Sequence, residues 1–193
     1  MTDILFPPPA PVLVPLRDGA GLYPVARIFC VGRNYADHAK EMGQEVDREA
    51  PFYFTKSPVH LILSGETVPY PPGTQDFHHE MEFVVALGAP GFRVAAGEAM
   101  GHVFGYAAGL DMTRRDLQGQ AKDKRRPWDT AKDFENAAVL GPLTPAAEFG
   151  IPGPQAITLT LNGEPVQRSH LSEMVWSVPE IIAHLSTLYH LAP

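Results

Sequence analysis

Short apolar runs recur along this chain between clusters of glycine, proline and polar residues, a pattern typical of strands rather than of long helices. The run at residues 80–87 begins with alternating acidic and apolar residues and ends in a continuous apolar stretch, which indicates a strand that enters the core. Strands are predicted over residues 26–31, 52–55, 61–68, 80–87 and 103–110.

Helical signals are fewer. Ser177 and Glu180 form a capping box with a proline between them, and the apolar positions that follow have helical spacing to about His190. Two further helices are predicted, over residues 35–42 with Asn34 as a cap and over residues 113–122 with Thr113 as a cap.

Turn residues complete the prediction of the fold. Asn162-Gly163 separates two alternating segments, residues 157–161 and 164–167, and is the dipeptide that a type I′ hairpin turn requires. With 20 prolines, 17 glycines and few helices, the chain is expected to form a β-rich α+β domain. Residues 1–24 are proline-rich and are expected to form an extended arm ahead of a single domain over residues 25–193.

The net charge of −7 argues against nucleic acid or an anionic membrane as a partner. One basic run, Lys122 to Arg126, is an exception, and a solvated helix end explains it better than a nucleic-acid patch does. No segment is apolar for long enough to span a bilayer, and the single cysteine, Cys30, cannot form an internal disulfide. These features predict a cytoplasmic protein whose Cys30 is a strand thiol rather than a nucleophile.

Two acids in the strand at residues 80–87 carry the first chemical signal. Because alternate residues of a strand point the same way, Glu80 and Glu82 are expected to share one face, about 7 Å apart at Cα. Such a pair repels unless a cation or a proton neutralises it, and a hard divalent ion would do so. An exposed strand face with two acids is the alternative, but the apolar residues that follow favour burial.

A third acid, Asp111, ends the apolar run that forms the next predicted strand. It could be a helix cap or a metal ligand, and together with Glu80 and Glu82 it would complete an all-oxygen site with room for water and substrate. His78 and His79 raise the alternative of zinc, but no cysteine or second histidine lies at the usual spacing. Magnesium or manganese is therefore the better prediction.

Other polar residues are weaker candidates on their own. His38 and Glu41 lie three positions apart on a predicted helix, where a carboxylate would orient the imidazole as a base, although a surface pair is the commoner case. Lys132 and Arg115 could bind a carboxylate or an enolate. No glycine-rich phosphate loop is present, so a nucleotide cofactor is not indicated.

Four segments, in this order, resemble motifs of the fumarylacetoacetate hydrolase family. Val31-Gly-Arg-Asn-Tyr-Ala-Asp-His-Ala-Lys-Glu-Met42 is similar to its catalytic-helix motif, and His79-Glu-Met-Glu82 is similar to its Glu-x-Glu metal motif. Residues 109–118 resemble the segment with its third metal acid, and residues 127–132 resemble the segment with its active-site lysine. Four motifs in register are far more specific than any one of them.

The resemblance implies a mixed β-roll, usually a homodimer, that binds Mg²⁺, with Mn²⁺ or Ca²⁺ as alternatives. It implies hydrolysis of a carbon–carbon bond in a small 2,4-diketo acid, and the residues at 112–118 and 126–128 are most similar to those of members that cleave fumarylpyruvate in aromatic catabolism. The implied roles are metal ligands for Glu80, Glu82 and Asp111, catalysis for His38, Glu41 and Lys132, and substrate binding for Arg33, Arg115 and Gln118.

Two departures from the family pattern are visible. The sequence stops at Pro193, before the Gly-Asp strand and the Thr-Gly-Thr-Pro loop that family members carry, so either the sequence is a piece of a longer chain or the active site is incomplete. Asp133 stands beside Lys132 where relatives tend to have a small residue. Acylpyruvase, oxaloacetate decarboxylase or hydroxymuconate-type isomerase activity and a non-catalytic binding module remain the alternatives.

Overall fold

The computed structural model describes residues 4–35 and 48–193, and a mixed five-stranded sheet is its largest element. β8 (Val103–Asp111) is the longest strand and pairs antiparallel along one edge with β7 (Met81–Leu87). Its other edge is shared by β10 (Ala138–Leu140) and β11 (Thr144–Pro145), both antiparallel to it. β5 (Leu61–Leu63) then pairs parallel with β10, which makes the sheet mixed.

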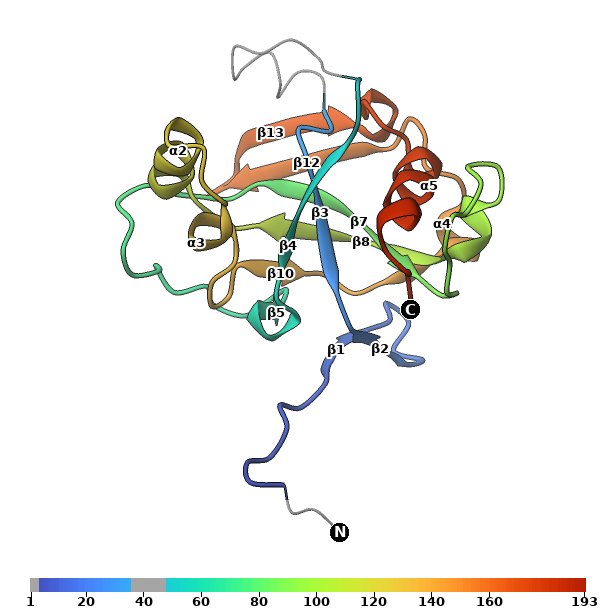
Figure 1. Cartoon of the computed structure of the whole chain (residues 1–193), viewed down its shortest axis with the longest axis horizontal. Coiled ribbons are helices and arrows are strands. Elements are labelled where there is room, and N and C mark those ends of the chain that lie inside the picture. The colour runs from blue at the N-terminus through green and yellow to red at the C-terminus, as the bar shows by residue number, and fades with distance from the viewer. Residues whose placement is uncertain (1–3, 36–47) are drawn as a thin grey trace.

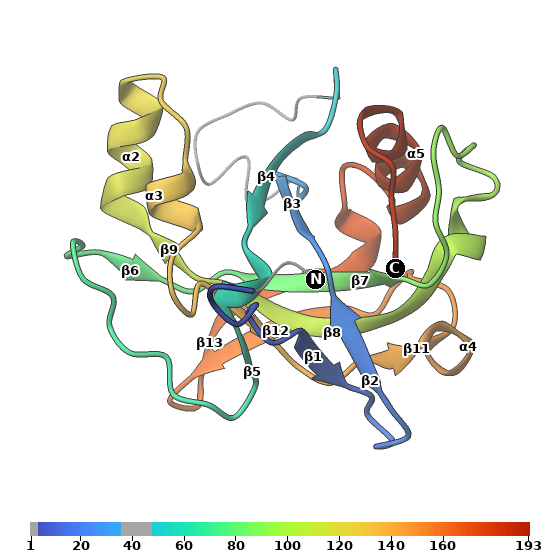
Figure 2. The same ribbon diagram turned by 60° about the horizontal axis from the view of Figure 1, so that its bottom comes forward.

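Among the residues that the structure describes, four two-stranded units surround this sheet. In both ribbon views β3 crosses in front of β7 and β8 (Figures 1 and 2). The paired strands are β1 (Val12–Pro15) with β2 (Leu22–Val25), β3 (Ile28–Gly32) with β4 (Phe52–Lys56), β6 (Phe77–His78) with β9 (Thr113–Arg114), and β12 (Ala156–Leu161) with β13 (Glu164–His170).

The α-helices of the described residues lie at the two ends of the sheet. The pair α2 and α3 covers one end, and α5 and α4 lie at the other (Figure 1). These are α2 (Arg115–Asp123), α3 (Asp129–Lys132), α4 (Ala146–Phe149) and α5 (Val178–Leu188), with short 3₁₀ turns at Pro58–His60, Ala99–His102 and Leu171–Glu173. Among residues 4–35 and 48–193, no helix combines the length and the hydropathy that crossing a bilayer requires.

Apolar side chains form separate clusters on the two sides of the sheet. The β1–β2 hairpin packs Val14, which is fully buried, against Leu61, Ala107 and Leu143. On α5, the apolar positions that the sequence predicted bury Val178, Ile182 and Leu185 against the segment around Ala99. The proline-rich N-terminal segment therefore contributes a hairpin to the core.

The strand-rich α+β fold is as predicted, and so are most strands. At the β12–β13 turn, Asn162 and Gly163 both have positive φ, of 52° and 89°, as a type I′ turn requires. The α5 capping box is also confirmed, because Ser177 and Glu180 bond each other's backbone.

Two boundaries were wrong, and one expectation falls partly outside the described chain. The helix predicted from Thr113 begins at Arg115, because Thr113–Arg114 pairs with β6. The strand predicted over residues 61–68 stops at Leu63, where Glu66 bends back and accepts the Leu63 amide. The helix predicted at residues 35–42 lies almost wholly outside the described residues, and the Asn34 side chain bonds the backbone of Trp176 on both its amide atoms.

Candidate metal centre

The pairing of β7 with β8 brings the three predicted acids together. Glu82 stands directly opposite Gly109, and the Asp111 amide donates to the Glu80 carbonyl at 2.9 Å, which continues the ladder by one pair. Glu80 and Asp111 are therefore cross-strand neighbours, and Glu82 is their diagonal neighbour on the same face. One carboxylate oxygen from each acid lies within 4.8 Å of the others. We call Glu80, Glu82 and Asp111 the acid centre.

The glycine opposite Glu82, Gly109, has no space for a side chain. A Cβ atom added to Gly109 would lie 2.8 Å from the Val84 Cγ2 atom and 3.1 Å from the Val139 carbonyl oxygen. Both approaches are closer than ordinary packing allows, so any larger residue would displace β7 or β10. The small residue thus permits the tight strand pairing that positions Glu82.

Lys132, at the end of α3, bonds two members of the acid centre. Its Nζ donates to Glu80 Oε2 at 2.6 Å, to Asp111 Oδ2 at 2.7 Å and to Thr113 Oγ1 at 2.7 Å. The side chain is 3% exposed and all three of its N–H donors are used. The sequence predicted Lys132 as a site residue, and the structure places its charge beside the acids.

A second buried lysine, Lys56 at the end of β4, was not predicted. Its Nζ lies 2.8 Å from Asp111 Oδ1 and donates to the carbonyl oxygens of Met112 and Lys132. The lysine ends a largely apolar strand, Phe52-Tyr-Phe-Thr, and a cation at the end of such a strand is the signal that could have identified it. Lys56 therefore joins the acid centre to the backbone that carries Lys132.

Arg115 and Gln118 extend the site along α2. One Arg115 nitrogen pairs with Glu80, and the other donates to Gln118 Oε1 at 2.6 Å. Gln118 is 3% exposed, and its amide N–H groups bond no acceptor among the described residues. Both residues line the same cavity as the acid centre, so the Gln118 amide is available to a bound oxygen.

The members of the acid centre differ in charge. Burial alone would raise the pKa of Glu80, but Lys132 and Arg115 lower it to about 2. Glu82 accepts no hydrogen bond from any described residue, and burial together with the charges of Asp111 and Glu80 raises its pKa to about 8. Glu80 is thus an ionised, paired carboxylate, whereas Glu82 holds a proton at neutral pH unless a cation replaces it.

These properties fit a hard divalent ion. Asp111 Oδ1 is buried and accepts no well-formed hydrogen bond, although Lys56 lies close to it, and Glu82 has no partner among the residues described. Within residues 4–35 and 48–193, these three acids are the set of clustered metal-ligating groups, and all of them offer oxygen. An ion there would be held by Glu80, Glu82 and Asp111 and would offset both the burial and the repulsion that keep Glu82 protonated.

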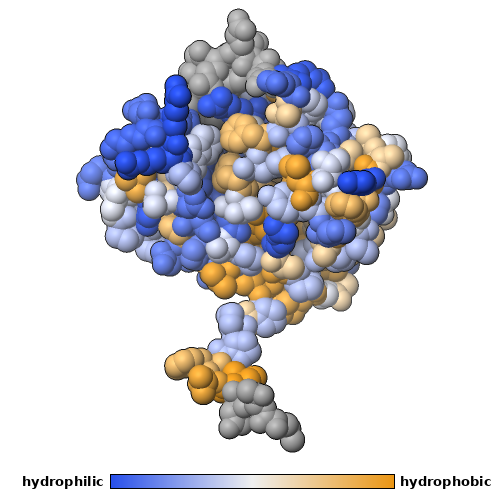
Figure 3. Space-filling view, viewed as in Figure 1, coloured by the Kyte–Doolittle hydropathy of each residue, from blue (hydrophilic) through white to orange (hydrophobic). Residues whose placement is uncertain are grey.

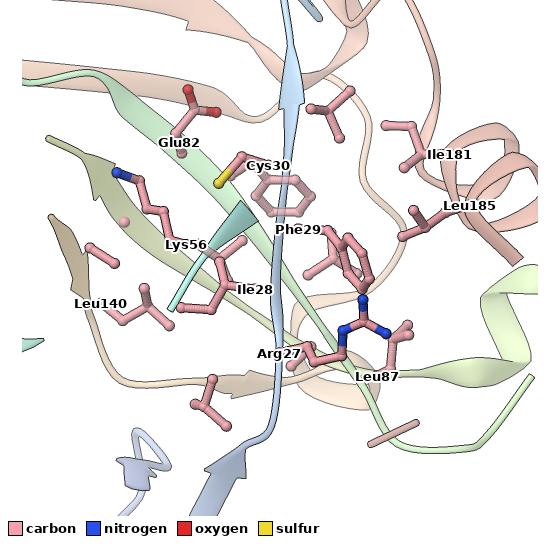
Figure 4. A pocket seen from close by; sticks show the side chains of 18 of the residues that line it. Arg27, Ile28, Phe29, Cys30, Lys56, Glu82, Leu87, Leu140, Ile181 and Leu185 are labelled. Atoms are coloured by element: carbon pink, nitrogen blue, oxygen red, sulfur yellow. The ribbon is translucent and has the colours of Figure 1, made fainter. Parts of the chain in front are cut away.

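Two cavities meet at the acid centre. A polar one of about 220 Å³ contains Arg33, Arg115, Gln118 and Lys132 among its lining residues. A mostly apolar one of about 300 Å³ lies between β3, β7 and α5. In Figure 4, Glu82, Cys30 and Lys56 gather at one end of the apolar cavity and Arg27 lies at the other. Substrate oxygens would therefore meet the acids from the polar side.

The remaining candidates have less support in the structure. His38 and Glu41 lie outside the described residues. Burial raises the pKa of the Cys30 thiol well above its ordinary value, in keeping with an unreactive strand cysteine. His78 is bonded to Asp76, away from the acid centre, which gives no support to the zinc alternative.

Comparison with known proteins agrees with the geometry. Residues 27–193 match the model of the fumarylacetoacetate (FAA) hydrolase C-terminal family. This chain belongs to that family. It is 54% identical over 155 residues to a fumarylpyruvate hydrolase of a Ralstonia species, covering 79% of this chain and 80% of that protein. It is 36% identical over 170 residues to the oxaloacetate tautomerase YcgM of Escherichia coli, covering 88% of this chain and 77% of that protein.

Solved structures of the fumarylacetoacetate hydrolase family have the same fold. Fumarylpyruvate hydrolase from Pseudomonas aeruginosa, in complex with Mn²⁺ and pyruvate, superposes with a TM-score of 0.93 at 43% identity, covering 99% of this chain and 84% of that one. A fumarylpyruvate hydrolase homologue from Burkholderia cenocepacia gives 0.90 at 41% identity, covering 98% and 82%. The expected family fold, with its mixed β-roll, is confirmed.

Proposed function

We propose that this protein is a divalent-metal-dependent hydrolase that cleaves fumarylpyruvate into fumarate and pyruvate. The observation that carries the proposal is the convergence of Glu80, Glu82 and Asp111 on one point beside a buried lysine. The similarity to a fumarylpyruvate hydrolase at 54% identity, and to a related structure with Mn²⁺ and pyruvate, supports this choice of substrate.

The reaction adds water across one carbon–carbon bond. Water attacks the carbonyl carbon of the fumaryl group, the bond to the neighbouring methylene carbon breaks, and its electron pair remains on the pyruvate part as an enolate. The enolate then takes up a proton, so fumarylpyruvate and water give fumarate and pyruvate. A divalent ion held by the acid centre would supply Lewis-acid polarisation of the 2-oxo acid oxygens.

His38 and Glu41 are proposed to activate the water. The imidazole of His38 would take the proton from water while the Glu41 carboxylate orients the ring, a contribution of roughly 100- to 10,000-fold in rate. His38→Ala should therefore retain Mn²⁺ binding while losing hydrolysis. Full activity in that variant would remove the assignment.

The cations of the site are proposed to stabilise the negative charge that moves onto the pyruvate part. Lys132 lies 2.6 to 2.7 Å from the acids that would hold the metal, so its charge is fixed before the reaction begins. Arg115 and the Gln118 amide line the same cavity and would bind substrate oxygens, and Arg33 would act at its rim. Fixed charges of this kind need no rearrangement during the reaction, and removing one costs about 100-fold or more.

The assay that tests the proposal compares fumarylpyruvate, acetylpyruvate and oxaloacetate with metal-free enzyme and with added Mg²⁺, Mn²⁺ or Ca²⁺. The expected result is loss of activity on chelation, recovery with Mg²⁺ or Mn²⁺, and the highest kcat/KM on fumarylpyruvate. Activity that is indifferent to chelation would contradict the metal centre. Preference for oxaloacetate would favour the tautomerase relatives instead.

Three wider properties complete the proposal. We propose that the protein is a cytoplasmic homodimer of aromatic catabolism, on the basis of the family to which it belongs. We propose that residues 25–193 form the catalytic domain, in keeping with a family match that begins at residue 27, and that the N-terminal segment, residues 1–24, joins it through the β1–β2 hairpin, which packs into the core. Sedimentation of the purified protein at several concentrations would test the dimer.

A further inference from the structure

One face of α2 points along the polar cavity. Arg115, Gln118 and Lys122 lie at positions i, i+3 and i+7, which places them on one side of a helix, and all three line that cavity. Arg115 pairs with Glu80, so its end of the helix lies at the acid centre. Lys122 lies two turns further along, about 10 Å from Arg115 at Cα.

Two aromatic rings, those of Trp128 and Phe52, lie at the Lys122 end of this helix face. The Lys122 Nζ atom lies 5.2 Å from the centre of the Trp128 ring, and the Arg33 guanidinium lies 5.7 Å from that of Phe52. The two rings contact each other edge to face at 5.5 Å. Contacts with ring faces hold the two cations in place while leaving their N–H donors available.

Positive charge at this end of the cavity is not balanced by acids. Neither Lys122 nor Arg33 forms an ion pair with any carboxylate among the described residues. Burial lowers the pKa of Lys122, and the nearby charges of Arg33 and Arg115 lower it further. The next residues of the basic run, Lys124 to Arg126, are exposed and do not line the cavity. In Figure 3, strongly hydrophilic residues gather over α2.

We propose that Lys122 and Arg33 form a second anion subsite, which binds the distal carboxylate of a dicarboxylic diketo acid while its planar chain lies along Trp128. The inference rests on the proposed function and specifies its substrate class. An extended seven-carbon diketo diacid spans about 7–8 Å between its carboxyl carbons. That length suits a ligand that reaches from the acid centre toward Lys122, which lies about 10 Å along α2 from Arg115 at Cα, while Arg33 lines the same cavity. A monocarboxylic substrate would leave the subsite without a partner.

The test compares Lys122→Gln with wild-type enzyme on fumarylpyruvate and on acetylpyruvate, which carries a methyl group in place of the distal acid. Loss of a charged hydrogen bond should lower kcat/KM for fumarylpyruvate by roughly 10- to 100-fold, whereas kcat/KM for acetylpyruvate should change by less than about 3-fold. Lys122→Arg should retain the preference for fumarylpyruvate. Lys124→Gln, which removes an exposed charge from the same helix end, is the matched control and should behave as wild type.

A binding measurement separates this inference from the proposed function. Fumarate is titrated into Mn²⁺-loaded protein that is saturated with pyruvate, and the expected result is a 10-fold or weaker Kd in Lys122→Gln. An unchanged Kd, or an equal loss of both activities in Lys122→Gln, would overturn the subsite. Wild-type enzyme that binds fumarate through Lys122 but cleaves neither diketo acid would instead overturn the proposed function alone.

Discussion

Two ionic clusters lie next to each other in this protein, because residues that are adjacent in the chain contribute their side chains to different clusters. Lys56 and Lys132 face the acid centre, whereas their neighbours Ser57 and Asp133 form a separate cluster with His60. In that cluster Asp133 accepts from the Ser57 amide at 2.8 Å and from its hydroxyl at 2.6 Å, and it lies 2.6 Å from His60 Nδ1. We call Asp133, Ser57 and His60 the Asp133 clamp.

The two clusters differ in how completely they are satisfied. Burial alone would raise the pKa of Asp133, but the hydrogen bonds from Ser57 and His60 bring it below its ordinary value. The pKa of Glu82, which has no donor among the described residues, is raised to about 8. A carboxylate that is fully bonded stabilises the fold, whereas a buried carboxylate without a partner costs stability and is retained for a ligand.

The largest effect should follow removal of the unsatisfied acid. Glu82→Gln keeps the shape of the side chain but removes a ligand charge, so Mn²⁺ affinity should fall at least 100-fold and kcat/KM about 1,000-fold or more. The metal-free variant should be at least as stable as wild type, because burial and the charges of Asp111 and Glu80 oppose the ionisation of the acid that it replaces. Calorimetric titration with Mn²⁺ and thermal unfolding of the metal-free protein check both statements. Normal metal affinity together with normal turnover would rule out the acid centre.

Lys56→Met removes the buried lysine that bonds the acid centre and whose neighbour, Ser57, belongs to the Asp133 clamp. The methionine fills similar space but leaves Asp111 Oδ1 and the carbonyl oxygens of Met112 and Lys132 without their cation. Breaking a buried pair from one side costs about 3–5 kcal/mol of folding stability, and we expect kcat to fall about 100-fold as Asp111 moves. Urea unfolding and steady-state kinetics measure the two effects. Unchanged stability would show that Lys56 is not the partner that holds Asp111.

The raised pKa of Glu82 gives opposite pH effects on stability and on metal binding. Between its ordinary value of 4.5 and about 8, the folded state holds a proton that the unfolded state has lost. Metal-free protein should therefore lose stability as pH rises through this range, by up to about 1.4 kcal/mol per pH unit. Metal affinity should instead increase about tenfold per pH unit up to pH 8, because the ion displaces the proton. Thermal unfolding from pH 5 to pH 9 checks the first slope, which should be absent in Glu82→Gln.

Within the acid centre and its surroundings, the three acids and Lys56 show what the sequence alone could and could not predict. Glu80, Glu82 and Asp111 were identified because strand alternation and an acid at a strand end are local patterns, and the register of β7 with β8 confirms that they converge. Lys56 was missed because its partner is 55 residues away along the chain, and only the folded pairing brings Nζ and Asp111 together. The Thr113 boundary was wrong because pairing with β6 overrode a local capping signal.

Asp133→Ala tests the Asp133 clamp, and of these variants it should have the smallest effect on activity. Three donors would lose their acceptor, which should cost roughly 1–3 kcal/mol of folding stability. Because Asp133 has a lowered pKa, its contribution is present above the unfolded value of 3.8 and disappears as pH falls below it. Wild type and Asp133→Ala should therefore converge in stability in acid and differ at pH 7.

Turnover of Asp133→Ala should fall by less than about fivefold, since Lys132 keeps its own three acceptors. A loss of activity as large as that of Lys56→Met would mean that the clamp positions Lys132 for catalysis and that the two clusters act as one.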